Sequence, residues 1–262
     1  MFRMATSPLR GLPDFLVIGA QKAGSTSLYR YLTSHPSIRT PRRKEVHFFD
    51  HAYGKGECWY RAQFPVRLRS ASNWLTGEAS PYYLFHPHVP QRAARLVPHA
   101  KLIVVLRNPV DRAWSHYQHV VTRGYESLSF DAALEREAEL IPVEERKMMA
   151  MPEYRSLAHE RHSYLARGRY FSQLARWLTS FSRDQLFVIS SEQMFRSPSA
   201  ALTECFSFLG LSPFVIDSHE VFKSGVYGDQ MGPATRARLI EYFRPHNQHL
   251  EQLLGMAFDW DR

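Results

Sequence analysis

The segment Phe15-Leu-Val-Ile-Gly-Ala-Gln-Lys-Ala-Gly-Ser-Thr-Ser-Leu28 decides the fold of this 262-residue chain. Its first four residues form a short apolar run, which predicts a buried strand. Gly19 and Gly24 bound a loop that carries Lys22, and glycine lets the backbone pass close to a ligand. Three hydroxyl residues then begin a helix, whose unpaired N–H groups and positive dipole attract an anion. The segment therefore predicts a strand, a phosphate-binding loop and a helix.

This loop differs from that of the nucleotide hydrolases, whose pattern is G-x-x-x-x-G-K-[ST]. Gly19 and Gly24 have the spacing of its two glycines, but Ser25 stands where that pattern has lysine. Lys22 lies inside the loop instead, so it meets a different part of a bound anion. Taken alone, the segment is also compatible with an ordinary strand, turn and helix that exposes one lysine.

The composition is that of a globular protein with an excess of positive charge. A hydrophobic content of 44% and an aromatic content of 13% support a sizeable core, and we expect one domain over residues 1–262. The net charge of +8 suits a nucleotide, a sulfated or carboxylated glycan, an acidic carrier or nucleic acid. The chain has no long basic tail and no RNP-type aromatic motif, so we expect no nucleic-acid partner.

Targeting and metal-binding signals are absent from the sequence. No apolar window of about 20 residues predicts a transmembrane segment, and residues 1–13, expected to form a short tail, lack the apolar centre of a signal peptide. Cys58 and Cys205 make no disulfide framework and lie outside any zinc-binding spacing. These features favour a reducing, cytoplasmic setting, and we expect no metal.

Alternation of strands and helices predicts an α/β fold of three layers, with a central, mostly parallel sheet flanked by helices. Further strands are expected over residues 74–78, 101–106 and 186–190. Helices are expected over residues 25–34, 59–64, 88–96, 109–117, 130–140, 164–181, 199–209 and 235–254. Residues 140–165 are charged and methionine-rich, which is typical of a substrate-side insertion or lid.

A second anion site is expected where the strand 101–106 ends. Ligands bind at the carboxyl ends of parallel strands, and Arg107 follows this strand directly. The fork of its guanidinium and the hydroxyl of Ser115, eight residues later, predict a receiver for a second phosphate. The alternative is an Arg107 that caps a helix, beside a surface pair of Asp111 and Arg112.

Four motifs in order carry a family resemblance: Gly19-Ala-Gln-Lys-Ala-Gly-Ser-Thr-Ser-Leu28, Lys44-Glu-Val-His-Phe-Phe-Asp50, Glu78-Ala-Ser-Pro81 and Leu106-Arg-Asn-Pro-Val-Asp-Arg-Ala-Trp-Ser-His-Tyr117. They resemble the sulfotransferases that use 3′-phosphoadenosine 5′-phosphosulfate (PAPS), most closely the heparan sulfate sulfotransferases and their bacterial relatives. The resemblance extends to Phe258-Asp-Trp260 and so covers about the whole chain. It implies a P-loop-like fold.

The resemblance implies transfer of a sulfuryl group from PAPS to a hydroxyl or an amine, with 3′-phosphoadenosine 5′-phosphate (PAP) as product and no metal. Lys22 would contact the 5′-phosphosulfate and stabilise the leaving phosphate. The 5′-phosphate would lie on the backbone of a set of loop and helix residues, Ala23, Gly24, Ser25, Thr26 and Ser27. Arg107 and Ser115 would hold the 3′-phosphate, and Lys223, Gly225 and Tyr227 would form a lid over the cofactor.

Glu45 occupies the position of the proposed catalytic base in this branch of the family. Near a bound sulfate and partly desolvated, its carboxylate is expected to have a raised pKa. His47 would point to the same side of an extended segment, and so could orient Glu45 or act as the base itself. A loop ion pair of Glu45 with Lys44 or Arg43 is the alternative. The resemblance implies that substrate-binding residues lie in the third motif, namely Glu78, Ser80 and Pro81.

Several features leave other functions open. Ala79 stands where the glycan branch often has lysine, and residues 222–228 lack the cysteine of that branch. His116 and His119 have a metal-binding spacing, but no third ligand is near in sequence, so a polar helix face is expected.

The alternative functions are a P-loop nucleotide kinase or NTPase, a non-catalytic basic anion-binding module and an inactive relative. The acceptor could be a small molecule, a lipid, a carrier-bound intermediate or a saccharide.

Overall fold

The computed structural model describes residues 2–67, 73–216 and 230–260 and contains one five-stranded sheet. The strands lie in the order β2-β3-β1-β4-β5, and every neighbouring pair is parallel. Their bounds are Phe15–Gly19 for β1, Ile38–Arg39 for β2, Leu75–Ala79 for β3, Lys101–Leu106 for β4 and Leu186–Ser190 for β5. The expected α/β fold with a mostly parallel sheet is confirmed, and the sheet is parallel throughout.

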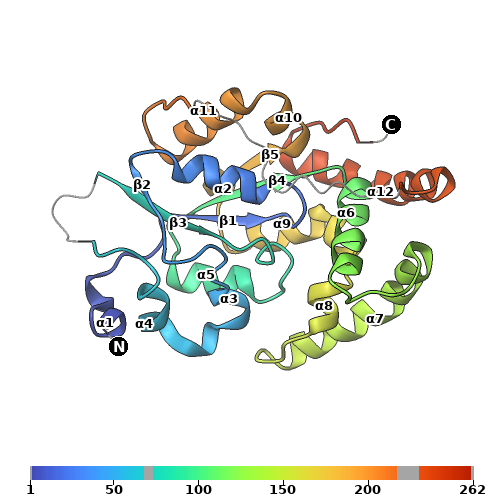
Figure 1. Ribbon diagram of the computed structural model, residues 1–262, viewed down its shortest axis with the longest axis horizontal. Coiled ribbons are helices and arrows are strands. Elements are labelled where there is room, and N and C mark those ends of the chain that lie inside the picture. The colour runs from blue at the N-terminus through green and yellow to red at the C-terminus, as the bar shows by residue number, and fades with distance from the viewer. Residues whose placement is uncertain (1, 68–72, 217–229, 261–262) are drawn as a thin grey trace.

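Helices cover both faces of this sheet, which makes three layers. Figure 1 shows α2, α10 and α11 on one side and α3 and α5 on the other. Parallel strands buried on both faces carry near-continuous apolar runs, and the first four residues of β1 are completely buried. The same holds for the last five residues of β4. The central strands, β1 and β4, therefore hold their carboxyl ends at fixed positions, one beside the other.

Each helix expected from the sequence has a counterpart in the structure, whereas the short helices at residues 2–5, 48–51 and 191–196 were not expected. Those that form the layers and their flanks have the following bounds: α1 Phe2–Ala5, α2 Ser25–Thr33, α3 Phe48–His51, α4 Gly56–Arg61, α5 Val89–Leu96, α6 Pro109–Thr122, α9 Tyr170–Leu178, α10 Ser191–Arg196, α11 Pro198–Leu209 and α12 Pro233–Leu254. The predicted helix over residues 164–181 is broken. It consists of a 3₁₀ turn, η3 (Ala166–Gly168), followed by α9, and Arg169 between them has a non-helical ψ of 68°. A Cβ atom on Gly168 would lie 2.8 Å from Phe243, so only glycine fits there.

The helix predicted to end at residue 140 continues as α7 (Phe130–Ala150), with Pro142 inside it. Proline removes one helical hydrogen bond and usually breaks a helix. Here tertiary contacts hold the second half, because Ile141 and Met148 are buried and Glu144 accepts a hydrogen bond from Ser156 Oγ at 2.6 Å. The short α8 (Leu157–Arg161) follows, so the segment 140–165 is ordered as two helices and their connection. Its role as an insertion or lid stays a prediction.

The N-terminal residues 2–13 pack against α4 and the turn that follows it. Arg3 Nε donates a hydrogen bond to the Ala62 carbonyl at 2.6 Å, and Arg10 Nη1 donates to the Phe64 carbonyl at 2.8 Å. Among the described residues, no helix combines the length and the apolar character that crossing a membrane requires.

A second apolar cluster lies beside the sheet and fixes α6, which begins just after β4. It joins side chains of α6, α7 and α12, among them Val110, Phe130 and Phe243. The N-terminus of α6 is capped by Asn108, whose Oδ1 accepts a hydrogen bond from the amide of Val110 at 2.9 Å. The cluster and the cap together hold Ser115 and His116 in place at the end of the sheet.

Candidate active site

The loop after β1 has the geometry of an anion-binding loop. Gly24 is the N-cap of α2 with φ of 100°, a conformation that favours glycine. A Cβ atom there would also lie 2.9 Å from Met194 Cε and from Phe195 Cζ. The first turn of α2 follows at once, and amides at this position have no partner within the helix. The positive φ and the lack of space for a Cβ atom therefore both require glycine at position 24, where the backbone turns and presents these amides.

The ends of β1 and β4 meet, as the sequence predicted. Arg107 Nη1 donates a hydrogen bond to the Lys22 carbonyl at 3.1 Å, and Tyr170 Oη donates to the Arg107 carbonyl at 2.9 Å. The alternative of a surface pair of Asp111 and Arg112 is wrong. Arg112 is completely buried, and Asp111 pairs instead with Arg236 of α12.

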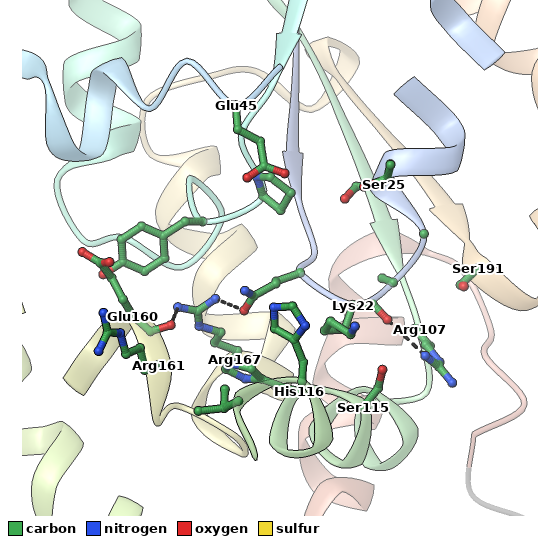
Figure 2. A pocket seen from close by; sticks show the side chains of 18 of the residues that line it. Lys22, Ser25, Glu45, Arg107, Ser115, His116, Glu160, Arg161, Arg167 and Ser191 are labelled. Atoms are coloured by element: carbon green, nitrogen blue, oxygen red, sulfur yellow. Dashed lines mark hydrogen bonds between the residues drawn. The ribbon is translucent and has the colours of Figure 1, made fainter. Parts of the chain in front are cut away.

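One cavity of about 900 Å³ opens at this edge of the sheet. Most residues predicted from the sequence line it: Lys22, Ala23, Gly24, Ser25, Thr26, Glu45, His47, Pro81, Arg107 and Ser115. Figure 2 shows Lys22, Ser25, Arg107, Ser115 and Ser191 at one end, and Glu160 and Arg161 at the other. The predicted anion sites and the predicted base therefore share one cavity, and a ligand can contact both.

The backbone around Glu45 and His47 is not extended, contrary to the expectation from sequence. Their φ angles are 59° and 53°, and α3 begins directly after His47. Hydrogen bonds hold this conformation, because the Glu45 amide donates to the Ala79 carbonyl at 3.1 Å and the His47 amide donates to Ser80 Oγ at 3.2 Å. The two side chains still meet, with His47 Nε2 lying 3.5 Å from Glu45 Oε2.

Backbone strain is concentrated on the three residues predicted to be catalytic. Within the described part of the chain, the non-glycine residues with positive φ are Lys22, Glu45 and His47. Such conformations cost about 1–3 kcal/mol each and persist where the surrounding structure imposes them, often at functional sites. All three residues line the same cavity, so the strain is localised at the place where a reaction would occur.

The electrostatics of Glu45 differ from the expectation. The hydrogen bond with His47 lowers the pKa of Glu45 to about 2, together with the charge of Lys44 and against the effect of burial. Burial lowers the pKa of His47, but hydrogen bonds with Asp50 and Glu45 outweigh it and raise the pKa to about 10. The direction of this pKa shift is opposite to the one expected from sequence, because that expectation counted desolvation and a bound sulfate but not the cations His47 and Lys44 around the carboxylate.

Lys44 connects the base segment with the phosphate-binding loop. Its Nζ donates hydrogen bonds to Thr26 Oγ1 at 2.7 Å and to Glu45 Oε1 at 3.2 Å. The loop ion pair with Lys44, the alternative interpretation of Glu45, is thus present in the structure. It does not compete with a role at the cavity, because the Glu45 side chain remains 40% exposed.

Glu78, Ser80 and Ser27 are completely buried and lie behind the cavity wall. Glu78 accepts hydrogen bonds from Tyr60 Oη at 2.6 Å and Ser80 Oγ at 2.8 Å, and burial raises its pKa. The structure thus does not bring the predicted substrate contacts Glu78 and Ser80 to the cavity. Ser80 instead supports the amide of His47. The predicted lid residues Lys223, Gly225 and Tyr227 lie outside the described residues.

Sequence analysis missed several residues of the wall, chiefly Gln21, Tyr82, Glu160, Arg161 and Arg167. Gln21 lies in the phosphate-binding loop but was given no role, and the others carry no local signal because they reach the cavity from the turn after β3 or from the segment near α8. His116 and His119 were assigned to a polar helix face, yet both line the cavity and His116 is buried.

A possible metal-binding trio exists within the described ranges, formed by His47, Asp50 and His51 with ligand atoms within 4.8 Å of one another. It overlaps the Glu45–His47 pair. The contact of His47 Nδ1 with Asp50 Oδ2, at 2.7 Å, is that of a hydrogen bond, and we assign no metal.

Comparison with known proteins places this cavity in context. The sulfotransferase domain family matches residues 12–223. The bifunctional heparan sulfate N-deacetylase/N-sulfotransferase 3 of Homo sapiens is 37% identical over 272 residues, which cover 93% of this chain and 30% of the relative. The heparan sulfate glucosamine 3-O-sulfotransferase 6 of Mus musculus is 28% identical, with 96% of this chain and 75% of the relative covered.

A solved structure is also similar over nearly the whole chain. The crystal structure of a sulfotransferase from Alicyclobacillus acidocaldarius has a TM-score of 0.78 and 33% sequence identity, covering 96% of this chain and 100% of that chain. The chain spans about 30% of the length of the bifunctional relatives it matches.

Proposed function

The chain belongs to the sulfotransferase domain family, whose members use PAPS, and from this we propose that it transfers the sulfuryl group of PAPS to a hydroxyl or an amine. One observation carries the proposal. Two anion-binding strand ends and a carboxylate aligned by a histidine line a single cavity. Sulfuryl transfer is an in-line displacement like phosphoryl transfer, so positioning and charge stabilisation account for most of the catalysis.

The residues at the strand ends fit the two anionic groups of PAPS. The first turn of α2 and the loop backbone suit the 5′-phosphate, because helix N-termini bind anions. Lys22 would lie against the bridging oxygen and stabilise the charge that develops there as the S–O bond breaks. Arg107 and Ser115, at the same end of the cavity, would bind the 3′-phosphate (Figure 2).

Glu45 would act as the general base and His47 as its positioning residue. Glu45 is ionised at neutral pH and can accept the acceptor's proton, whereas the protonated imidazole of His47 has no lone pair to accept one. The hydrogen bond of His47 Nδ1 with Asp50 fixes the ring. This assignment selects between the two roles that the sequence left open for His47.

A nucleotide kinase or NTPase and a purely binding module are less well supported. Ser25 stands where a hydrolase loop has its lysine. A basic binding module explains the net charge of +8 but not a strained, ionised carboxylate in the same cavity as two anion sites. The titration with PAP, AMP and ATP described below distinguishes these alternatives from a sulfotransferase.

An acidic saccharide is the acceptor that the cavity and the relatives favour. The end of the cavity away from the donor site carries Arg155 and Arg161. The guanidinium carbon of Arg161 lies 3.9 Å from the ring centroid of Tyr125. Cations and an aromatic face suit a sugar with carboxylate or sulfate groups. The names of the relatives point to heparan sulfate. A screen with labelled PAPS should begin with heparan sulfate oligosaccharides and use a neutral saccharide as control.

The first test is calorimetric titration with PAP, AMP and ATP without metal. We expect PAP to bind about 100-fold more tightly than AMP, because Arg107 and Ser115 would make charge-assisted hydrogen bonds that AMP cannot receive. The Arg107→Ala variant should lose most of this preference. Equal affinities of PAP and AMP in the wild type would contradict the assignment of the 3′-phosphate site.

The pH profile tests the roles of Glu45 and His47. In the wild type, the acid limb of kcat/KM should lie below pH 4, because His47 holds the pKa of Glu45 near 2. In His47→Asn, that pKa should rise toward the ordinary value, since burial then opposes only the charge and hydrogen bond of Lys44, and the acid limb should move to higher pH.

The exposed His99, replaced in the same way, is the control and should leave the profile unchanged. An acid limb that does not move in His47→Asn would show that His47 does not set the ionisation of the base.

A further inference from the structure

Arg167 is a buried arginine on the wall of the cavity, next to the phosphate-binding loop. Arg167 is 4% exposed and lies in the turn η3. Its Nη1 donates a hydrogen bond to Gln21 Oε1, and Gln21 directly precedes Lys22. Its Nη2 donates to the Glu160 carbonyl at 2.8 Å, and its guanidinium lies 4.8 Å from the ring centroid of Tyr82. These contacts fix the guanidinium beside Gln21, the residue that precedes Lys22.

The charge of Arg167 has no carboxylate partner in the described part of the chain. Glu160, which is close in sequence, forms its ion pairs with Arg155 at 2.6 Å and His51 at 2.9 Å instead. The Arg167 Nε is buried and makes no hydrogen bond with any described residue. Burial lowers the pKa of Arg167 to about 10, so the side chain remains charged at neutral pH. A buried cation without a counter-ion is costly even when it is hydrogen-bonded, and a bound anion would reduce this cost.

His116 offers a second unsatisfied group at the same place. It is 1% exposed, and its Nδ1 is buried without a hydrogen-bond partner among the described residues. Burial and the neighbouring charges of Arg167 and Arg112 lower its pKa well below the ordinary value, so the ring is neutral and can donate one hydrogen bond. Figure 2 shows His116 between Arg167 and Lys22, with Glu45 on the opposite wall.

We propose that Arg167 and His116 bind the oxygens of the transferred sulfuryl group, on the wall that faces Glu45. The inference rests on the proposed function. The acceptor oxygen or nitrogen bonds to sulfur as the bond from sulfur to the 5′-phosphate oxygen breaks, the acceptor's proton passes to Glu45, and PAP leaves. The sulfuryl oxygens keep their negative charge throughout, so a fixed guanidinium and an N–H donor would hold the group in line with both oxygens.

The position of Arg167 favours the sulfuryl group over an anionic group of the acceptor. Its guanidinium is bound to Gln21, the neighbour of the lysine assigned to the bridging oxygen. The arginines assigned to the acceptor come from the segment near α8, where Arg155 pairs with Glu160 at 2.6 Å and Arg161 lies over the ring of Tyr125. An acceptor contact is therefore the alternative outcome of the test.

The test compares calorimetric titrations of PAPS and PAP, which differ by the sulfuryl group. We expect Arg167→Gln to weaken PAPS binding about tenfold or more, because a charge-assisted hydrogen bond is lost, and to leave PAP affinity within about twofold. Arg167→Lys keeps the charge without the fork and should weaken PAPS binding by a smaller factor, again with PAP unchanged. Circular dichroism checks that each variant folds. If Arg167→Gln does not fold, Arg167→Lys provides the test.

The matched control is Arg92→Gln. Arg92 is also buried and donates to backbone carbonyls, those of Phe49 and Pro152, but it lies outside the cavity. It should bind both ligands as the wild type does. Equal losses of affinity for PAP and PAPS in the Arg167 variants would overturn the proposal and indicate that Arg167 supports the phosphate-binding loop instead. Unchanged binding of both, with a raised KM for the acceptor, would assign Arg167 to the acceptor. A wild type that binds neither ligand would overturn the proposed function as well.

Discussion

Replacing Glu45 with glutamine should lower kcat about 1,000-fold, within the 10²–10⁴-fold range typical of a general base. Glutamine has the shape of glutamate but cannot accept the acceptor's proton. Its contacts with Lys44 and His47 are at the edge of the cavity, and the neighbouring Thr26 and loop backbone remain in place. PAP affinity should therefore stay within about threefold, which calorimetry checks beside the turnover of labelled PAPS.

Glu57→Gln is the control for this variant. Glu57 also accepts a hydrogen bond from a cation, Arg61 Nε at 2.5 Å, but it lies on α4 outside the cavity. Its turnover should equal that of the wild type. A Glu45→Gln enzyme that retained more than about a tenth of wild-type kcat would exclude Glu45 as the base. Loss of PAP binding in the same variant would indicate instead that Glu45 supports the loop.

Replacing Lys22 with methionine should lower kcat by about 10²–10³-fold, the cost of removing one group that stabilises charge in a transition state. Methionine keeps an unbranched stem of similar length and loses the charge. Lys22 has φ of 68°, and lysine and methionine pay a similar backbone cost there, so the change isolates the ammonium group.

The measurement for Lys22→Met is again kcat beside PAP affinity. PAP retains the 5′-phosphate, so we expect its binding to weaken by about tenfold at most, much less than the fall in kcat. The control is Lys55→Met, an exposed lysine 4.8 Å from the ring centroid of Trp59 and outside the cavity. A fall in kcat no larger than the fall in PAP affinity would mean that Lys22 binds the donor without acting in the transfer step.

Local patterns predicted the part of the site formed by consecutive residues. The strand β1, the loop with Lys22 and the start of α2 follow one another within 14 residues, so their arrangement depends on short-range backbone preferences. The meeting of this loop with Arg107 also followed, because adjacent parallel strands bring their carboxyl ends to one edge.

Where long-range contacts decided the structure, the sequence prediction was wrong or incomplete. The helix α7 passes through Pro142 because its second half is anchored by packing and by Ser156. Glu78 carries a motif that resembles a substrate contact, yet three hydroxyl groups from Tyr60, Ser80 and Tyr83 hold it in the core. Neither outcome can be obtained from periodicity, since each depends on residues brought close only by folding.

The sequence by itself determined the parallel α/β architecture and the anion-binding loop. These depend on apolar periodicity and on glycine, both of which are local. The candidate base, Glu45, came from the resemblance to the sulfotransferases. The tertiary structure alone decided the charge states of Glu45 and His47 and the place of Arg167 and His116 in the cavity that Lys22 lines. The reason is physical: a pKa and a desolvated charge depend on which groups surround an atom and how much water is excluded, and both are set by packing between distant segments.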